Sequence, residues 1–297
     1  TARFFNPNHR YTKNKPEIPV MSYPERKQLK IAILDLYEGA ANEGMRCIRE
    51  IIQDWGASGH FEVSVTEFDV RLQRDIPGLE YDIFISSGGP GSPLESEGSE
   101  WENNYFNWIK TVEEWNRNEN NFPKKHIFFI CHSFQLASRY FNIAHVCKRK
   151  STAFGVFPIH MLEEGRLELV FNGLRDPFYS VDSRDYQVIE PDHVRLKKMG
   201  GHILAIEKER PHVPLERAIM GVRFNPWFIG TQFHPEADAI GMAMYLQRAD
   251  KKQTVIENHG EAKWKSMVEQ LQDPEKITWT HDHVLPNFLE LASADLY

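Results

Sequence analysis

The sequence is poor in cysteine, and its charges form no block of one sign. Three cysteines in 297 residues, Cys47, Cys131 and Cys147, are an odd number without close pairs, which argues against a disulfide framework and favours a reducing compartment. The 35 Lys and Arg residues stand against 42 Asp and Glu residues, and no basic patch suits a phosphate backbone. We therefore expect no nucleic acid partner and a cytoplasmic location.

Long apolar runs are also absent. No stretch approaches the length that spans a bilayer, and residues 1–29 contain no basic start followed by an apolar segment, so we expect neither a membrane partner nor a signal peptide. Neither metal-ligand spacing nor a phosphate-binding GxxxxGK[ST] loop occurs. We expect no metal and no cofactor.

Short apolar runs alternate with helical patterns through the first half of the chain. Strand signals occur at 30–37, 61–70, 81–87 and 126–130, and helical patterns at 42–55 and 99–115. This alternation is typical of parallel β-α units, so the sequence predicts an α/β fold with a mostly parallel sheet and helices on both faces. Ligands of such sheets bind at the carboxyl ends of the strands.

The composition predicts three regions. Residues 1–29 are polar and rich in proline, which predicts an extended arm, and residues 30–250 form the α/β domain. Residues 251–297 form a helical extension, with helical patterns at 251–271 and 282–292 that we expect to pack on the core or on a second copy in a homo-oligomer. The candidates for core or interface positions in this extension are Trp264, Trp279 and Phe288.

A cysteine stands at the end of the last of these strands. The run Phe128-Phe129-Ile130 leads into Cys131, and a helical pattern begins at His132. A residue at a sharp strand-to-helix turn is exposed, and the positive end of the helix favours the thiolate, which is the nucleophile. The backbone N–H of His132 can then donate to an oxyanion. Taken alone, Cys131 would more often be a buried structural cysteine.

A glycine-rich loop follows the neighbouring strand. The segment GGPGSP, residues 88–93, lets the backbone approach a reacting carbonyl closely, and we assign the second oxyanion donor to Gly89. Taken alone, this loop would be a turn. The two loops should lie side by side, because both follow carboxyl ends of adjacent strands.

A third segment supplies a base. WFIGTQFHPEAD, residues 227–238, predicts a strand that delivers His234 and Glu236, and a helical pattern follows at 237–249. Residues two apart in an extended chain share a face, and Pro235 keeps the backbone from turning helical. A thiol nucleophile needs an imidazole to take its proton, and the imidazole needs an acceptor that orients it.

Together the three motifs resemble the class I glutamine amidotransferase superfamily over residues 30–250, in the order GGPGSP, CHSFQ, GTQFHPE. The resemblance implies a flavodoxin-like class I amidotransferase fold and a triad of Cys131, His234 and Glu236. It also implies that glutamine acylates Cys131 with loss of ammonia, that water then releases glutamate, and that Gln135 helps to hold the substrate. Cys47 and Cys147 have no catalytic role in this interpretation.

Several positions depart from that family. Phe129 and Ser133 replace the glycines of its Gly-x-Cys-x-Gly elbow, so we expect Phe129 to need a roomier surrounding. Ser183 and Arg184 replace a Ser-His pair. Homoserine O-acyltransferases, a sister family with the same triad, resemble the chain at both places.

In that sister family an arginine fourteen residues after the catalytic histidine, here Arg248, holds the homoserine carboxylate. Against this resemblance, Thr152 replaces a lysine of that family, and GGPG replaces its Gly-Ala-Pro. Arg248 is equally explained as a cation at a helix end. Arg184 has a surface charge as its alternative explanation, but the aromatic and apolar residues that flank it favour a binding role over this alternative.

Three hypotheses therefore stay open. In the first, glutamine is the substrate and ammonia serves a separate acceptor enzyme or a small acceptor. In the second, acyl-CoA acylates Cys131 and homoserine resolves the thioester, with Ser183, Arg184 and Arg248 as substrate-binding residues. In the third, the chain is a catalytically silent binding protein, which we rank last because nucleophile, base and orienting acid are all present.

Overall fold

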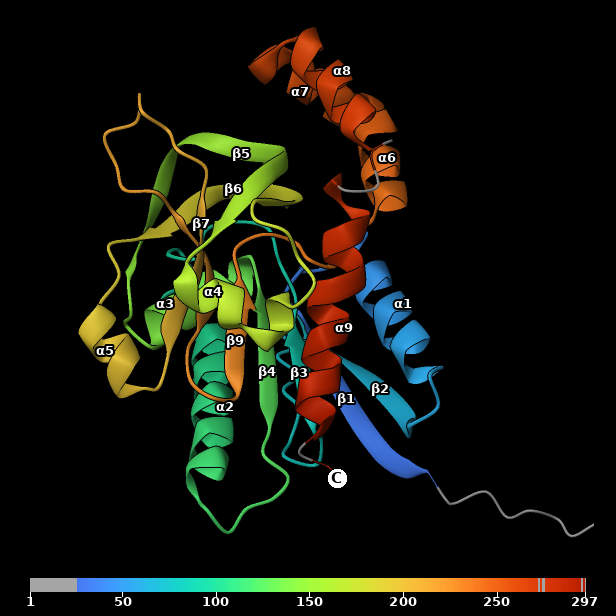
Figure 1. The fold of residues 1–297 in the computed structure, drawn as a ribbon, viewed down its shortest axis with the longest axis vertical. Helices are drawn as coiled ribbons and strands as arrows, with labels where there is room; N and C mark the ends of the chain where they lie inside the picture. Colours follow the sequence, from blue (N-terminus) through green and yellow to red (C-terminus); the bar gives the residue numbers. More distant parts are fainter. Residues whose placement is uncertain (1–25, 272, 274–275, 295, 297) are drawn as a thin grey trace, which may run out of the picture.

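The computed structural model describes residues 26–271, 273, 276–294 and 296. Within them, nine strands form one sheet in the order β2-β1-β3-β4-β9-β8-β7-β5-β6 (Figure 1). The strands are β1 (Lys27–Asp35), β2 (Phe61–Asp69), β3 (Ile83–Ser86), β4 (His126–Ile130), β5 (His145–Met161), β6 (Phe178–Ile189), β7 (His202–Glu207), β8 (Ile219–Arg223) and β9 (Phe228–Thr231). The helices are α1 (Gly44–Gly56), α2 (Glu100–Arg117), α3 (His132–Tyr140), α4 (Glu163–Leu167), α5 (His193–Lys198), α6 (Ala239–Gln247), α7 (Ala249–His259), α8 (Glu261–Gln270) and α9 (Thr278–Ala294), with a 3-10 helix, η1, at Leu169–Phe171.

The predicted fold class is confirmed. Strands β2, β1, β3, β4 and β9 are parallel neighbours, and all three predicted motifs follow strands of this part. Strands β8, β7, β5 and β6 extend the sheet in antiparallel fashion. The motifs therefore meet at one edge of the sheet, because parallel strands have their carboxyl ends on the same side.

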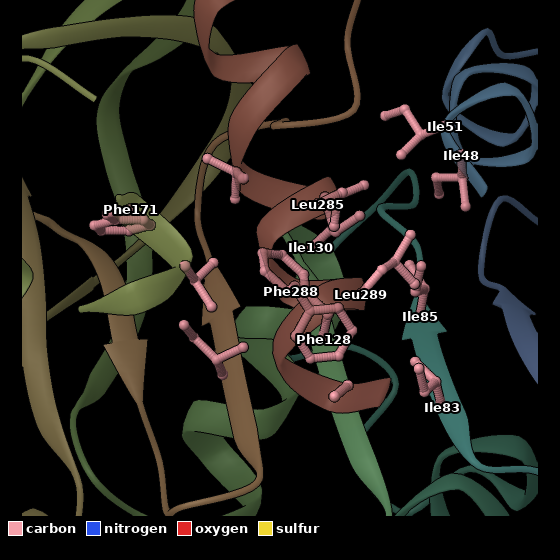
Figure 2. Close-up of a cluster of buried hydrophobic side chains, with 14 of the residues drawn as sticks. Ile48, Ile51, Ile83, Ile85, Phe128, Ile130, Phe171, Leu285, Phe288 and Leu289 are labelled. Carbon is pink, nitrogen blue, oxygen red and sulfur yellow. The ribbon is translucent and has the colours of Figure 1, made fainter. Parts of the chain in front are cut away.

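Strict alternation along the parallel strands divides the core between two faces. Ile83 and Ile85 point to the face that α1 and α9 cover, while Phe84 points to the opposite face, which α2 and α3 cover. Figure 2 shows the first face, where Phe288 of α9 lies against Phe128 of β4. Helices therefore cover both faces, as the sequence predicts.

Several predicted boundaries are wrong. Strand β1 begins at Lys27, so the last residues of the predicted arm belong to the sheet, and the arm up to residue 25 lies outside the described residues. The predicted helix 251–271 is interrupted at Gly260, whose φ of 82° does not fit a helix. The predicted strand 227–238 ends as β9 at Thr231.

The C-terminal extension divides into two parts. Helix α9 packs on the sheet, and Phe288 is a core residue with 1% exposure. Helices α6, α7 and α8 lie at one end of the molecule (Figure 1) and pack against Phe154 of β5, with Trp264 half-buried among them. Trp279 is 38% exposed. Among the described residues, no helix combines the length and the apolarity that crossing a membrane requires.

Candidate active site

Cys131 lies at a sharp turn between β4 and α3. Its backbone has φ 48° and ψ -95°, outside the range of ordinary helix or strand. Two hydrogen bonds hold this conformation: the Cys131 N–H donates to the Thr231 carbonyl at 2.8 Å, and the Gln135 N–H donates to the Cys131 carbonyl at 3.0 Å. Cys131 is nevertheless buried, with 5% exposure, so the exposed side chain predicted from this turn is wrong. An unusual backbone conformation at a strand-to-helix junction also holds the nucleophile of α/β-hydrolases.

Ser133 stabilises the turn where the amidotransferase elbow has glycine. Its hydroxyl accepts a hydrogen bond from the Ile130 N–H at 2.8 Å and donates to the Ser86 carbonyl at the same distance. The serine therefore joins the ends of β4 and β3. This tie positions Cys131 relative to the glycine-rich loop that follows β3.

Phe129 is accommodated in the core. It is fully buried and packs edge-on against Phe224 and Phe228. Its partner in β9 is Gly230, where an added Cβ would lie 2.9 Å from the Phe129 carbonyl oxygen and 3.0 Å from Phe134 Cδ2. The room expected around Phe129 therefore comes from a glycine on the neighbouring strand.

His234 and Glu236 form a hydrogen-bonded pair. His234 Nδ1 lies 2.8 Å from Glu236 Oε1. The two residues follow β9 in an irregular segment, and an isolated antiparallel bridge to Val181 of β6 holds the His234 backbone, with its N–H donating to the Val181 carbonyl at 2.9 Å. The side chains of His234 and Glu236 therefore lie together, but beyond the end of β9 and not within the strand.

The surroundings of His234 favour its protonated form. Burial alone would lower the pKa of His234, but the Glu236 carboxylate, followed by the charge of the Cys131 sulfur and its hydrogen bond to the imidazole, raises this pKa well above its ordinary value. The imidazole is thus hydrogen-bonded to the carboxylate and close enough to the Cys131 sulfur for its charge to raise the pKa of His234.

Two other groups contact the Cys131 sulfur. Gln232 Nε2 lies 3.6 Å from it, and the Ser183 carbonyl oxygen lies 3.8 Å away. Gln135, one helical turn after Cys131, donates from Nε2 to Gln232 Oε1 at 3.0 Å. The structure therefore brings Gln135 and the Ser183 backbone to Cys131, although the Ser183 side chain is exposed.

Glu236 is buried beneath the start of α1. Its side chain is 1% exposed, and Oε2 has no hydrogen-bond partner within the described part of the chain. An added Cβ at Gly44, the first residue of α1, would lie 3.2 Å from Oε1. The positive end of a helix stabilises a carboxylate at this position.

Tyr37 is a residue of this site that sequence reasoning missed. Burial raises the pKa of Tyr37 well above its ordinary value, and the nearby charges of Glu236 and Cys131 raise it further. An added Cβ at Gly88 would lie 3.2 Å from the Tyr37 hydroxyl and 2.9 Å from His234 Cε1. The available signal was its position at the carboxyl end of the first predicted strand, 30–37.

Each glycine of the loop has a different neighbour. Gly88 faces the His234 ring, and the Ser87 hydroxyl donates to the Gly88 carbonyl at 2.8 Å. Gly89 faces the Leu36 carbonyl, which leaves no space for a Cβ. Close packing of two backbones thus requires glycine at position 89, whether or not its N–H also serves an oxyanion.

His132 is buried directly after Cys131. Burial, assisted by the positive charges of Arg71 and Arg139, lowers the pKa of His132 to about 3, so its ring is neutral. Its Nε2 has no partner among the residues that the structure describes. Whatever its backbone N–H does, this ring takes no proton from Cys131 at neutral pH.

Arg184 and Arg248 lie in different surroundings. The Arg184 side chain is 1% exposed and pairs with Asp182 at 2.9 Å and Glu207 at 3.3 Å, which excludes the alternative that it is a surface charge. Arg248 is exposed at the junction of α6 and α7. The ion pairs of Arg184 border a cavity of about 240 Å³, whose lining also includes Arg149, Thr152 and Arg210.

The other two cysteines lie in different surroundings. Cys47 is buried in α1, and burial, followed by the charge of Asp238, raises its pKa to about 12. Cys147 accepts a hydrogen bond from Gln187 Nε2 at 3.7 Å. Within residues 26–271 and the described part of the C-terminal segment, no group of three His, Cys, Asp or Glu side chains is arranged to hold a metal ion.

Comparison with known proteins identifies the family. Residues 44–249, more than half of the chain, match the family model for glutamine amidotransferase class-I. The chain therefore belongs to the class-I glutamine amidotransferase family. A search among curated proteins found no significant match.

Solved structures share the fold. A glutamine amidotransferase from Thermotoga maritima has a TM-score of 0.63 and 14% identity, over 89% of this chain and 97% of that chain. A putative GMP synthase subunit from Thermoplasma acidophilum has a TM-score of 0.54 and 16% identity, over 91% and 96%. The CTPS glutaminase domain from Trypanosoma brucei, with bound acivicin, has a TM-score of 0.54 and 12% identity, over 90% and 94%. At these identities the likeness concerns the fold alone.

Proposed function

We propose that the protein hydrolyses the side-chain amide of glutamine, with Cys131 as nucleophile, His234 as acid and base, and Glu236 as the group that orients His234. The observation that supports this most is the 2.8 Å hydrogen bond between His234 Nδ1 and Glu236 Oε1, in an imidazole whose pKa is raised by the Glu236 carboxylate and by the nearby Cys131 sulfur. An imidazolium beside a sulfur stabilises the thiolate.

The reaction then has two steps. The Cys131 thiolate attacks the amide carbon, and the imidazolium of His234 gives its proton to the departing ammonia as the C–N bond breaks and a thioester remains. Neutral His234 next takes a proton from water, whose oxygen attacks the thioester and releases glutamate and the thiolate. We assign the oxyanion donors to the backbone N–H groups of Gly89 and His132.

Gln135 would contribute to substrate binding through its carbonyl oxygen. Its Nε2 already donates to Gln232 and, at 3.4 Å, to the Tyr186 carbonyl. This leaves the carbonyl oxygen of the Gln135 side chain as the acceptor it can offer to a substrate amine. In this proposal Gln135 binds the α-ammonium of glutamine.

Homoserine acyl transfer would use the same triad with acyl-CoA as the donor. It would need an arginine beside Cys131 to hold the homoserine carboxylate. The Arg184 guanidinium is already paired with Asp182 and Glu207, and Arg248 is exposed. Neither arginine therefore favours acyl transfer over glutamine hydrolysis. A catalytically silent binding protein would not need the hydrogen-bonded pair of His234 and Glu236.

The ammonia would serve a separate acceptor. Two of the similar structures are described as a glutaminase domain and as a synthase subunit, so each is one part of a larger protein or assembly. We infer that this protein likewise delivers ammonia to an acceptor enzyme or to a small acceptor molecule.

Separate incubations distinguish the hypotheses. The purified protein is incubated with glutamine, and in parallel with acyl-CoA plus homoserine, while glutamate and free CoA are measured. Glutamate release that Cys131→Ser abolishes is the expected result. Release of CoA that depends on homoserine, without glutamate release from glutamine, would replace this proposal with acyl transfer.

A further inference from the structure

The first turn of α9 contacts three distant segments of the chain, one of which carries Glu236. Three residues of this turn each donate a hydrogen bond to a carbonyl oxygen. Trp279 Nε1 donates to Gly173 at 2.9 Å, and the Thr280 hydroxyl donates to Tyr179 at 2.6 Å. His281 Nδ1 donates to Glu236 at 2.9 Å. These acceptors lie between 45 and 106 residues away along the chain.

The bond of His281 reaches the residue that orients His234. A carbonyl oxygen only accepts, so His281 Nδ1 carries the proton in this contact. Two residues further on, Arg46 of α1 binds both oxygens of Asp238, at 2.9 and 3.0 Å. The 236–238 turn is therefore held from α1 on one side and from α9 on the other.

Glu236 depends on its backbone for orientation. Only Oε1 of its carboxylate has a hydrogen bond within the described residues, to His234, while Oε2 is buried without a partner. With one directed bond, the carboxylate can rotate or shift unless the backbone beneath it is fixed. His281 supplies a bond at that backbone.

We propose that His281 is a positioning residue for Glu236, so that the C-terminal helix completes the active site. The proposal rests on the proposed role of Glu236 in orienting His234. It goes beyond the family comparison, because α9 lies outside the matched residues 44–249. Without the bond, the enzyme folds and binds glutamine, but its imidazole is poorly oriented.

Three variants test the proposal. His281→Ala removes the donor, and His281→Asn replaces Nδ1 with an amide N–H at a similar position. His283→Ala is the matched control, because His283 Nδ1 donates to Trp279 within the same helix at 2.7 Å and not to the 236–238 turn. Melting temperatures are measured for all three to compare their folding.

The first readout is steady-state glutamine hydrolysis. His281→Ala should lower kcat by about 10- to 100-fold with KM within about twofold, since a small displacement of a catalytic group is costly. His281→Asn should recover most of the rate, and His283→Ala should match the wild type. Equal kcat in His281→Ala and the wild type, or equal loss in His283→Ala, would overturn the proposal.

The second readout does not require glutamine to be the substrate. The rate of Cys131 alkylation by iodoacetamide is followed against pH in the tryptic peptide 126–139, which contains no other cysteine. The midpoint in His281→Ala should rise by about one pH unit, because a displaced Glu236 supports the imidazolium less. Three other titratable groups lie near Cys131 and His234. They are Tyr37, Cys47 and Asp238, and none of them is replaced in these variants.

This second readout separates the two proposals. A shifted midpoint in a protein that hydrolyses no glutamine keeps the role of His281 and removes the proposed reaction. An unshifted midpoint in an active enzyme removes the role of His281 and keeps the reaction.

Discussion

Glu236 holds His234 with one oxygen, and this single bond determines how the imidazole faces the sulfur. The Nδ1–Oε1 distance of 2.8 Å and the raised pKa of His234 both depend on the negative charge of the carboxylate. An amide of the same shape would keep the size but lose the charge, and its NH₂ group would favour a different tautomer of the ring.

Glu236→Gln should therefore lower kcat for glutamine hydrolysis by about 10² to 10⁴-fold, because His234 is then held in the wrong tautomer and loses its contribution as acid and base. KM should change little, because the carboxylate contacts His234 rather than the substrate. Steady-state kinetics check this, with the exposed Glu119→Gln as a control that keeps full activity. Wild-type kcat in Glu236→Gln would remove the carboxylate from the mechanism.

The residues of the site differ in how far the sequence could predict them. Cys131, His234 and Glu236 follow strand signals and carry groups with known chemistry, so local patterns pointed to them. His281 follows no strand signal, and Tyr37 ends a predicted strand but belongs to none of the three motifs. Their contacts with the site come from folding segments that are far apart in sequence. The buried pairing of Arg184 was missed for the same reason, since Glu207 lies 23 residues away on another strand.

Among the helices and strands, the sequence pattern predicted the bounds best in the parallel part of the sheet. Strand β4 has the predicted bounds, His126–Ile130, because a short apolar run between two polar segments leaves little choice. The strand expected at 227–238 ends early because the chain leaves β9, and the backbones of His234 and Glu236 bond instead to Val181 of β6 and His281 of α9. Tertiary contacts overrode the local pattern there.

Packing between β4 and β9 leads to a prediction at Gly230. Gly230→Ala should destabilise the protein by about 1–3 kcal/mol, because the added methyl group meets the Phe129 backbone and the Phe134 ring and the core must shift. Urea denaturation measures the change. Unaltered stability would mean that the glycine is not what accommodates Phe129.

Helix α9 is expected to be a core element and not a peripheral addition. Phe288→Ala should cost about 3–5 kcal/mol, because the side chain is 1% exposed and its ring packs edge-on against Phe128. Trp279→Ala, on the same helix but 38% exposed, should cost less. Similar losses in the two variants, compared by denaturant titration, would contradict this view of α9.

For the whole molecule, buried ion pairs on the antiparallel side of the sheet link stability to pH. Burial alone would raise the pKa of Glu168, but its bond to Arg223, at 2.6 and 2.8 Å, outweighs this and places the pKa below its ordinary value of 4.5. A carboxyl whose pKa is lowered on folding stabilises the native state above its unfolded pKa. That stabilisation is lost as pH falls through the folded pKa.

Thermal unfolding of wild type and Glu168→Gln across a pH series tests this linkage. The variant should be less stable at pH 7, where it leaves Arg223 buried without its charge partner. The difference between the two proteins should shrink as pH falls below about 4.5, where the wild-type carboxylate takes up its proton. A difference that stays constant with pH would show that this pair does not determine the acid stability.

A covalent intermediate on Cys131 tests the account most directly. The protein is mixed with isotopically labelled glutamine, quenched in acid within the first turnovers, and digested with trypsin. We predict that the label appears as a thioester on peptide 126–139 in the wild type, accumulates in Glu236→Gln if water attack is slowed more than acylation, and is absent in Cys131→Ser. Release of labelled glutamate at the wild-type rate by Cys131→Ser, or label on a peptide that lacks Cys131, would contradict the account.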